Sequence, residues 1–170
     1  LPASFLTPDS LEYFLDPRNH QPGIPLDMIA YHGYSMWENP KEGPDEWQAS
    51  FFTQANQFLQ QIDFAENIRK RLSPSTRVAV NETGTRVPLE LELDPNFSTL
   101  PDSYWNISGA QYAYLYLHIS KRDIDALHIS HGLGYPGFFP DLSLFDWTNG
   151  KPNARYRALE LIQDNFGPGD

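Results

Sequence analysis

The residue best placed to do chemistry is Glu82, because it stands alone at the end of a predicted buried strand. The segment Arg77–Gly84 reads RVAVNETG, so an apolar, β-branched run ends in one carboxylate, and a glycine turn is predicted to follow it. Strands of this composition lie inside parallel sheets, which carry functional groups at the carboxyl ends of their strands. We therefore expect Glu82 to face a ligand. The alternative is a solvated carboxylate in a surface turn.

A second set of functional groups follows the predicted strand 26–32, which ends in the letters His32-Gly33-Tyr34. Both the imidazole and the phenol can form hydrogen bonds with a neighbouring carboxylate. Because successive side chains of a strand point to opposite faces, Tyr31 is expected to point away from that carboxylate if His32 points toward it. The alternative for His32 is a buried histidine bonded to main-chain atoms.

The third predicted strand, 126–131, ends in His131, and the aromatic loop 132–150 that follows it contains Trp147. A tryptophan ring in such a loop offers a flat apolar surface on which a sugar ring can stack. The same ring can instead cover the end of the hydrophobic core. His131 has the same structural alternative as His32.

Several other kinds of chemistry are excluded by composition and spacing. The chain has no cysteine, which removes disulfides, thiolate nucleophiles and cysteine-type zinc sites. His128 and His131 are three residues apart on a predicted strand, so they lie on opposite faces and form no metal site. We expect neither a metal nor a cofactor. The net charge of −10, with no basic stripe beyond Arg69–Arg71, argues against nucleic acid as a partner.

The periodicity of apolar residues predicts an α/β fold. Helical spacing marks the segments 9–16, 47–72, 107–122 and 153–165, and the three strands lie between them. The longest helix has apolar residues three and four apart, as one buried stripe requires. This stripe consists of Phe51, Phe52, Ala55, Phe58, Leu59, Ile62, Ala65 and Ile68. Repeated βα units predict a parallel sheet with right-handed crossovers, covered by helices.

Three strands are few for a parallel sheet, so residues 1–170 are expected to form a single incomplete domain. An eight-stranded (β/α) barrel needs about 250 residues, and this chain would supply only its last part. The chain also begins with a helix that no strand precedes. The alternative is a small, self-contained α/β layer of three strands.

The order of the functional groups resembles the carboxyl-terminal part of the clan A glycoside hydrolases, which are (β/α) barrels of the family 5 and family 39 type. In such enzymes a His-X-Tyr pair commonly ends strand six, the nucleophilic glutamate ends strand seven, and an aromatic residue from strand eight or its loop floors the sugar site. His32-Gly33-Tyr34, Glu82 and Trp147 stand in this order. The resemblance spans most of the chain and implies that its strands are strands 6 to 8 of a TIM barrel.

This resemblance implies a retaining glycoside hydrolase with Glu82 as its nucleophile. Tyr34 and His32 would hydrogen-bond the Glu82 carboxylate, and His131 and Trp147 would contact the carbohydrate ligand. The alternative function is a non-catalytic carbohydrate-binding protein, lectin-like or for storage, derived from the same barrel.

A retaining enzyme also needs a second carboxyl group, the acid/base, which in this clan follows an asparagine on strand four. The chain does not include that strand, so it is expected to be inactive alone and to need the amino-terminal part of the barrel or a second chain as partner. Asn81-Glu82 itself resembles the acid/base dipeptide. Both roles therefore stay open, although counting strands back from the last helix favours the nucleophile.

Glycosylation motifs favour a secreted protein. Asn96 and Asn106 begin Asn-X-Ser/Thr sequons in the predicted loop 85–106 and are the expected glycan sites. A third sequon, at Asn81, lies within a predicted strand and is less suited to a glycan. No apolar run approaches the roughly 18 residues that a membrane span needs, so no membrane partner is expected.

Overall fold

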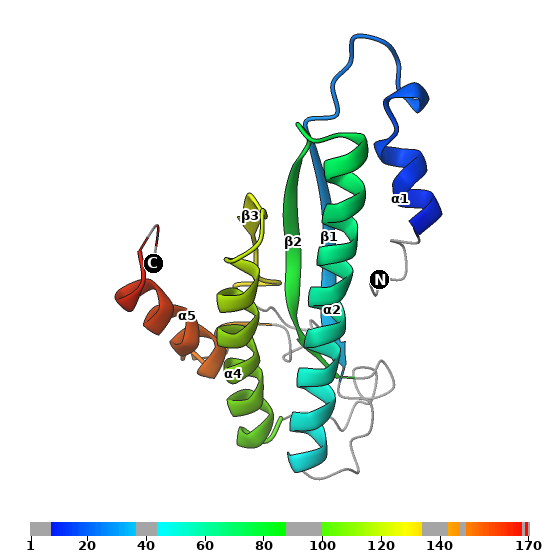
Figure 1. Cartoon of the computed structure of the whole chain (residues 1–170). Helices are drawn as coiled ribbons and strands as arrows, with labels where there is room; N and C mark the ends of the chain where they lie inside the picture. Colours follow the sequence, from blue (N-terminus) through cyan, green and yellow to red (C-terminus); the bar gives the residue numbers. More distant parts are fainter. Residues whose placement is uncertain are drawn as a thin grey trace.

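The computed structural model describes residues 8–36, 44–87, 100–133, 143–146, 149–167 and 169. Its elements follow one another as α1 (Pro8–Leu15), the 3-10 helix η2 (Pro17–Asn19), β1 (Met28–Met36), α2 (Pro44–Leu72), β2 (Arg77–Arg86), α4 (Asp102–Ile119), β3 (Ala126–Leu127) and α5 (Ala154–Asn165) (Figure 1). Strands alternate with helices, and the strands pair in parallel. The predicted α/β class is therefore confirmed.

The strands form one sheet in the order β1-β2-β3, so neighbours in sequence are also neighbours in space. β1 and β2 pair from end to end, whereas β3 is much shorter than the predicted strand 126–131. Main-chain hydrogen bonds nevertheless continue past β3. The amide of His128 donates to the Val80 carbonyl at 2.8 Å, and the amide of Ser130 donates to the Thr83 carbonyl at 3.2 Å. The chain after β3 therefore stays aligned with β2 as far as Ser130.

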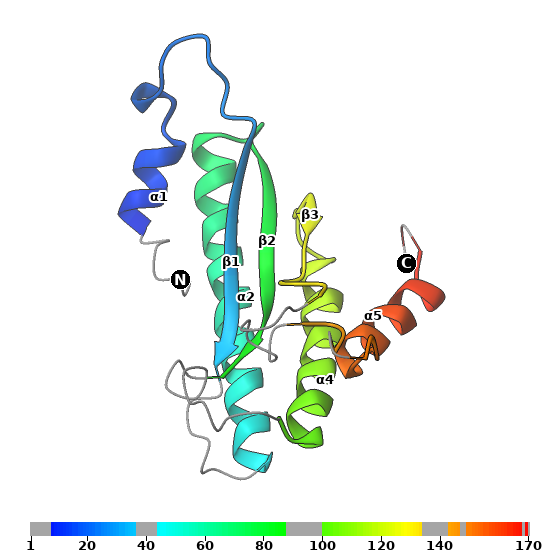
Figure 2. The ribbon, with the colours of Figure 1, turned by 180° about the vertical axis from the view of Figure 1, so that it is seen from behind.

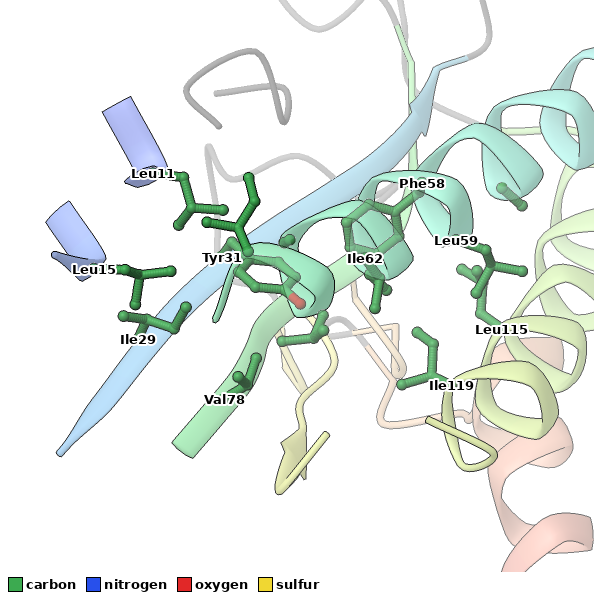
Figure 3. Packing of buried hydrophobic residues seen from close by; sticks show 14 residues of the cluster. Leu11, Leu15, Ile29, Tyr31, Phe58, Leu59, Ile62, Val78, Leu115 and Ile119 are labelled. Carbon is green, nitrogen blue, oxygen red and sulfur yellow. The ribbon is translucent and has the colours of Figure 1, made fainter. Parts of the chain in front are cut away.

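Helix α2 packs its predicted apolar stripe against β1 and β2. Every residue of the stripe is buried except Phe52, which is half-buried. Most of the stripe joins a core cluster that also contains Ile29 and Tyr31 of β1, Val78 and Val80 of β2, and Leu115 and Ile119 of α4 (Figure 3). The prediction of a single buried helix face is confirmed, and Tyr31 lies in the core on that side of the sheet.

Gly33 allows β1 to approach α2 closely. A β-carbon at this position would lie 2.4 Å from the buried ring of Phe58. Because the ring or the strand must then move, we expect Gly33→Ala to lower the free energy of unfolding by about 1–3 kcal/mol. Gly132→Ala is the matched control, since a β-carbon there meets no atom within 4 Å, and it should change stability by less than about 0.5 kcal/mol. Urea unfolding measures both, and equal stability of the two variants would contradict the close packing.

The helices lie on one side of the sheet. Figure 1 shows α2 in front of β1, with β2 beside it, and Figure 2, from behind, shows β1 in front of α2. Among the described residues no helix covers the opposite side, which we call the bare face. The residues of β1 that alternate with the core positions face this side, and they are exposed or half-buried: Ala30, His32 and Tyr34. Both faces of a parallel sheet are normally buried, so the bare face is an unusual feature.

Several predicted boundaries are wrong. β1 continues past His32 to Met36, and β2 continues through Gly84 to Arg86, so Gly84 is not a turn. A β-carbon on Gly84 would lie 2.8 Å from the hydroxyl of Tyr112, so the glycine serves close packing against α4. Helix α4 begins at Asp102, five positions before the predicted start.

Arg155 fastens the carboxyl end of β2 to α4 and α5. It is fully buried, although the apolar residues Tyr156, Leu159 and Ile162 of the same helix are only half-buried. Its guanidinium donates hydrogen bonds to the carbonyl and hydroxyl of Thr85 and to the hydroxyls of Ser108 and Tyr104. It also lies 5.1 Å from the ring centre of Trp105. No carboxylate of the described part of the chain forms an ion pair with Arg155, so hydroxyls, carbonyls and ring faces stabilise its charge.

The basic run Arg69–Arg71 is used within the fold. Its three side chains form ion pairs with Glu66, Asp123 and Glu12, respectively. Arg69, which is buried, also donates to the carbonyls of Pro74 and Thr76 and so closes the connection from α2 to β2. None of the helices in the described residues has the length and hydropathy that a membrane span requires.

Candidate functional site

A β-bulge in β2 decides which way Glu82 points. Tyr31 pairs with Val80, but the next residue of β1, His32, pairs with Glu82, so Asn81 is the extra residue of the bulge. Val80 faces the core. Regular alternation would place Glu82 on that same side. The bulge shifts the alternation by one residue, and the Glu82 side chain therefore lies on the bare face beside His32 and Tyr34.

Tyr34 holds the Glu82 carboxylate in place. The Tyr34 hydroxyl donates a hydrogen bond to Glu82 Oε2 at 2.6 Å, and both side chains are half-buried. Burial raises the pKa of the Tyr34 hydroxyl above its ordinary value, and the hydrogen bond to Glu82 raises it further. A phenol that stays protonated is a lasting donor to the carboxylate. Among the described residues only Oε2 of Glu82 has a hydrogen-bond partner, which leaves Oε1 for a ligand.

Ser130 is the third polar residue of the site, and it lies in the segment that continues from β3 alongside β2. The sequence did not indicate it. Its side chain is buried, and its Oγ lies 2.7 Å from the Tyr34 hydroxyl and 2.5 Å from Nδ1 of His131. Ser130 is held in this position by its main-chain bond to Thr83 of β2. The site thus draws one polar group from each of three neighbouring strand positions.

The other predicted site residues of this region, His32 and His131, form no hydrogen bond with Glu82 in the structure. His32 lies level with Glu82 and its ring centre is 6.2 Å from that of Tyr34, but the expected hydrogen bond from His32 to Glu82 is not formed. His131 is exposed, and its Nδ1 contacts the Oγ of Ser130. Arg86, which the sequence reading did not consider, lies with its guanidinium carbon 5.7 Å from the centre of the Tyr34 ring.

The raised pKa of Tyr34 predicts a loss of stability in alkali. Burial also raises the pKa of Tyr31 and of Tyr116. In the unfolded chain such phenols ionise near pH 10. The contribution of these phenols to the free energy of unfolding is therefore complete below about pH 10. It falls above that pH, because the unfolded state releases protons that the folded state keeps. We expect a slope of about 1.4 kcal/mol per pH unit for each phenol.

Urea unfolding between pH 8 and pH 11 measures how steeply the free energy of unfolding falls with pH. Tyr34→Phe should reduce this slope by the amount that one phenol contributes. A slope unchanged in Tyr34→Phe would show that the Tyr34 hydroxyl ionises as freely in the folded chain as in the unfolded one.

Two predicted positions, Trp147 and Asn96, lie outside the described residues. Asn106 is exposed, but it lies within α4 and not in the predicted loop, because the helix begins earlier than expected. His128 is also exposed. In the described part of the chain, no group of three or more histidine or acidic side chains is arranged to hold a metal ion.

No protein-family model matches the chain, and no curated protein matches its sequence. The function is therefore inferred from the geometry of Glu82, Tyr34 and Ser130.

Proposed function

We propose that the chain is the carboxyl-terminal part of a retaining glycoside hydrolase barrel, with Glu82 as its catalytic nucleophile. The observation that carries the proposal is the placement of the Glu82 carboxylate. It lies on the bare face, in the carboxyl-terminal half of a parallel strand, and accepts a hydrogen bond from Tyr34. Active sites of (β/α) barrels are built at that end of the strands.

The arrangement of the sheet supports a barrel. In a closed barrel the helices lie outside, and side chains of all strands fill the inner face. The described residues show sequential parallel neighbours with helices on one face. The outer edges of β1 and β3 have no partner strand within the described ranges. Further strands at these edges would cover the bare face, and β1, β2 and β3 would then be strands 6, 7 and 8.

The chemistry follows from the two oxygens of Glu82. Tyr34 donates a hydrogen bond to Oε2 and so holds the carboxylate in one orientation. Oε1 would attack the anomeric carbon and form a glycosyl-enzyme ester, while the leaving oxygen takes a proton from a second carboxyl group. Water would then break the ester, giving its proton to that same group. The second carboxyl group must lie about 5–5.5 Å from Glu82. We propose that the amino-terminal part of the barrel or a second chain supplies it.

Covalent trapping tests the proposal on the protein isolated from its natural source. A glycoside with fluorine at C2 and a good leaving group slows the second step and leaves the sugar attached to the nucleophile. After a panel of such glycosides, peptide mass spectrometry should find the sugar on Glu82. A label on another carboxylate in a protein that hydrolyses glycosides would overturn the assignment. Sugar binding that survives Glu82→Gln, without labelling or turnover, would instead support a carbohydrate-binding protein.

We also propose that the protein is secreted and glycosylated. Asn106 is exposed on α4, so a glycan at this position can extend into solvent. Intact mass of the natural protein before and after removal of N-linked glycans tests this directly. We expect a loss of mass and conversion of Asn106 to aspartate in the released peptide. An unmodified Asn106 in every copy would contradict the proposal for this site.

A further inference from the structure

Helices α4 and α5 enclose an open groove of about 700 Å³. The two helices come closest at the start of α5, where a β-carbon on Gly109 would lie 2.8 Å from the carbonyl oxygen of Ala154. From this crossing α5 diverges from α4, as Figures 1 and 2 show from opposite sides. Small side chains line the groove, among them Ala110, Ala113 and Ala158. The groove is therefore narrow at the crossing and wider toward the carboxyl end of α5.

The wider end of the groove exposes large apolar side chains to solvent. Leu161 is 64% exposed and Phe166 is 53% exposed, and both line the groove. Leu117 of α4 also lines it and is exposed. Single apolar residues are ordinary on a protein surface, but apolar residues gathered along one groove mark a surface that binds something. This groove therefore suits a cover whose apolar side faces the helices.

An attachment point for such a cover lies in the groove itself. Asn106 lines the groove, is exposed, and begins the sequon Asn106-Ile107-Ser108. N-linked glycans are attached while the chain is synthesised, so the burial of Ser108 in the folded protein does not block the attachment. From Asn106 to Leu117 the axis of α4 advances about 16 Å, at about 1.5 Å per residue. The first few sugars of a glycan span a comparable length.

The chemistry of the groove suits a sugar that is covered on one side only. N-acetylglucosamine, the first sugar of N-linked glycans in secreted proteins, has an acetyl methyl group and ring faces of C–H bonds. These groups pack on apolar side chains and on an aromatic ring such as that of Phe166. The hydroxyl groups lie at the ring edges, and in an open groove they keep their hydrogen bonds to water. Each contact is weak, but attachment at Asn106 gives the sugars a high effective concentration beside the groove.

We propose that the first sugars of an N-linked glycan on Asn106 lie in the groove between α4 and α5 and cover its apolar side chains. The inference rests on the proposed glycosylation of Asn106 and is independent of the role of Glu82. The outer sugars extend from the groove into solvent. The glycan thereby prevents Leu161 and Phe166 from associating with other apolar surfaces.

The rate of glycan release tests this placement in the whole protein, secreted from a eukaryotic host. An amidase cleaves the bond between Asn106 and the first sugar only while that sugar is out of the groove, so the rate follows the population of the open form. Leu161→Ser should make release about tenfold faster, because the sugars lose part of the apolar contact that one leucine provides. Ile24→Ser is the matched control and should leave the rate unchanged, since Ile24 is 61% exposed and does not line the groove.

Binding of the dye ANS reports the uncovered groove directly, because the dye fluoresces on exposed apolar surface. Its fluorescence should rise when the amidase removes the glycan. Asn106→Gln prevents glycosylation without altering Ser108, whose hydroxyl accepts a hydrogen bond from Arg155, and should show the same rise. Adding Leu161→Ser and Phe166→Ser to Asn106→Gln should abolish the rise, which locates the dye in the groove.

Two results would overturn the proposal. Equal release rates from the wild type and from Leu161→Ser would show that the glycan does not lie against Leu161. Unchanged dye fluorescence after glycan removal would show that polypeptide, and not sugar, covers the groove. Intact mass distinguishes these failures from failure of the glycosylation itself. An unmodified Asn106 in every copy refutes both proposals, whereas a glycan released at equal rates refutes only its position in the groove.

Discussion

Glu82→Gln should reduce glycoside turnover by about four orders of magnitude or more, the scale of loss seen when a nucleophile is removed from an enzyme. Glutamine keeps the size of the side chain and an oxygen that accepts from Tyr34, but its amide does not form the covalent ester. The variant must be measured in the assembled protein, with the polypeptide that carries the second carboxyl group. Steady-state hydrolysis of aryl glycosides gives the rate. Glu46→Gln, which alters an exposed carboxylate on α2, is the matched control and should keep full activity.

The stereochemistry of rescue by azide separates the two roles that remained open for Glu82. If Glu82 is the nucleophile, azide added to Glu82→Ala attacks the sugar directly, and the glycosyl azide has inverted configuration. If Glu82 is the acid/base, azide replaces water in the second step, and the configuration is retained. We expect inversion, read from the proton coupling at the anomeric carbon. Retention would assign the nucleophile to the other carboxyl group.

Arg155→Ala should lower the free energy of unfolding by about 3–5 kcal/mol, the largest stability effect that we expect from one side chain. The change leaves a cavity and removes the donors that serve Thr85, Ser108 and Tyr104. These hydroxyls retain some bonds with one another, because Thr85 also contacts Ser108 at 2.6 Å and Tyr104 at 3.0 Å. Urea unfolding followed by circular dichroism measures the loss.

Arg157→Ala is the matched control for Arg155, since it lies on the same helix. Arg157 is exposed, forms an ion pair with Glu160 and lies 5.7 Å from the ring centre of Tyr156. An exposed pair of this kind contributes about 0.5 kcal/mol or less. If Arg155→Ala lowered the free energy of unfolding no more than Arg157→Ala does, the buried hydrogen bonds of Arg155 would not stabilise the fold. Glu82 should also be held less firmly in Arg155→Ala, because Arg155 is hydrogen-bonded to Thr85, three residues after Glu82 in β2.

The sequence was sufficient for those features that depend on strong periodicity. The stripe of α2 repeats over many turns, so its buried face was predicted correctly. The parallel order of the strands also followed, because βα units leave few other topologies. The pairing of Tyr34 with Glu82 was expected from the resemblance, and the structure shows the bond at 2.6 Å.

Other features depend on contacts that no local pattern records. The bulge at Asn81 reverses the alternation of β2, and nothing in the letters around it signals an extra residue. The sequence does not distinguish Gly84 from a glycine in a turn, but in the structure Gly84 allows the Tyr112 hydroxyl to pack closely against β2. An arginine on an amphipathic helix ordinarily faces solvent, so the burial of Arg155 was not foreseen. Ser130 was overlooked because a single serine beside a histidine is common, and only its alignment with β2 brings it to Tyr34.

A crystal structure of the protein as isolated from its source gives the distance from Glu82 to the nearest second carboxyl group. We expect a glutamate from another polypeptide segment about 5–5.5 Å from Glu82, facing it across a bare face that further strands have closed into a barrel. A bare face covered by other means, with Glu82 pointing into solvent and no carboxyl group within about 10 Å, would contradict it.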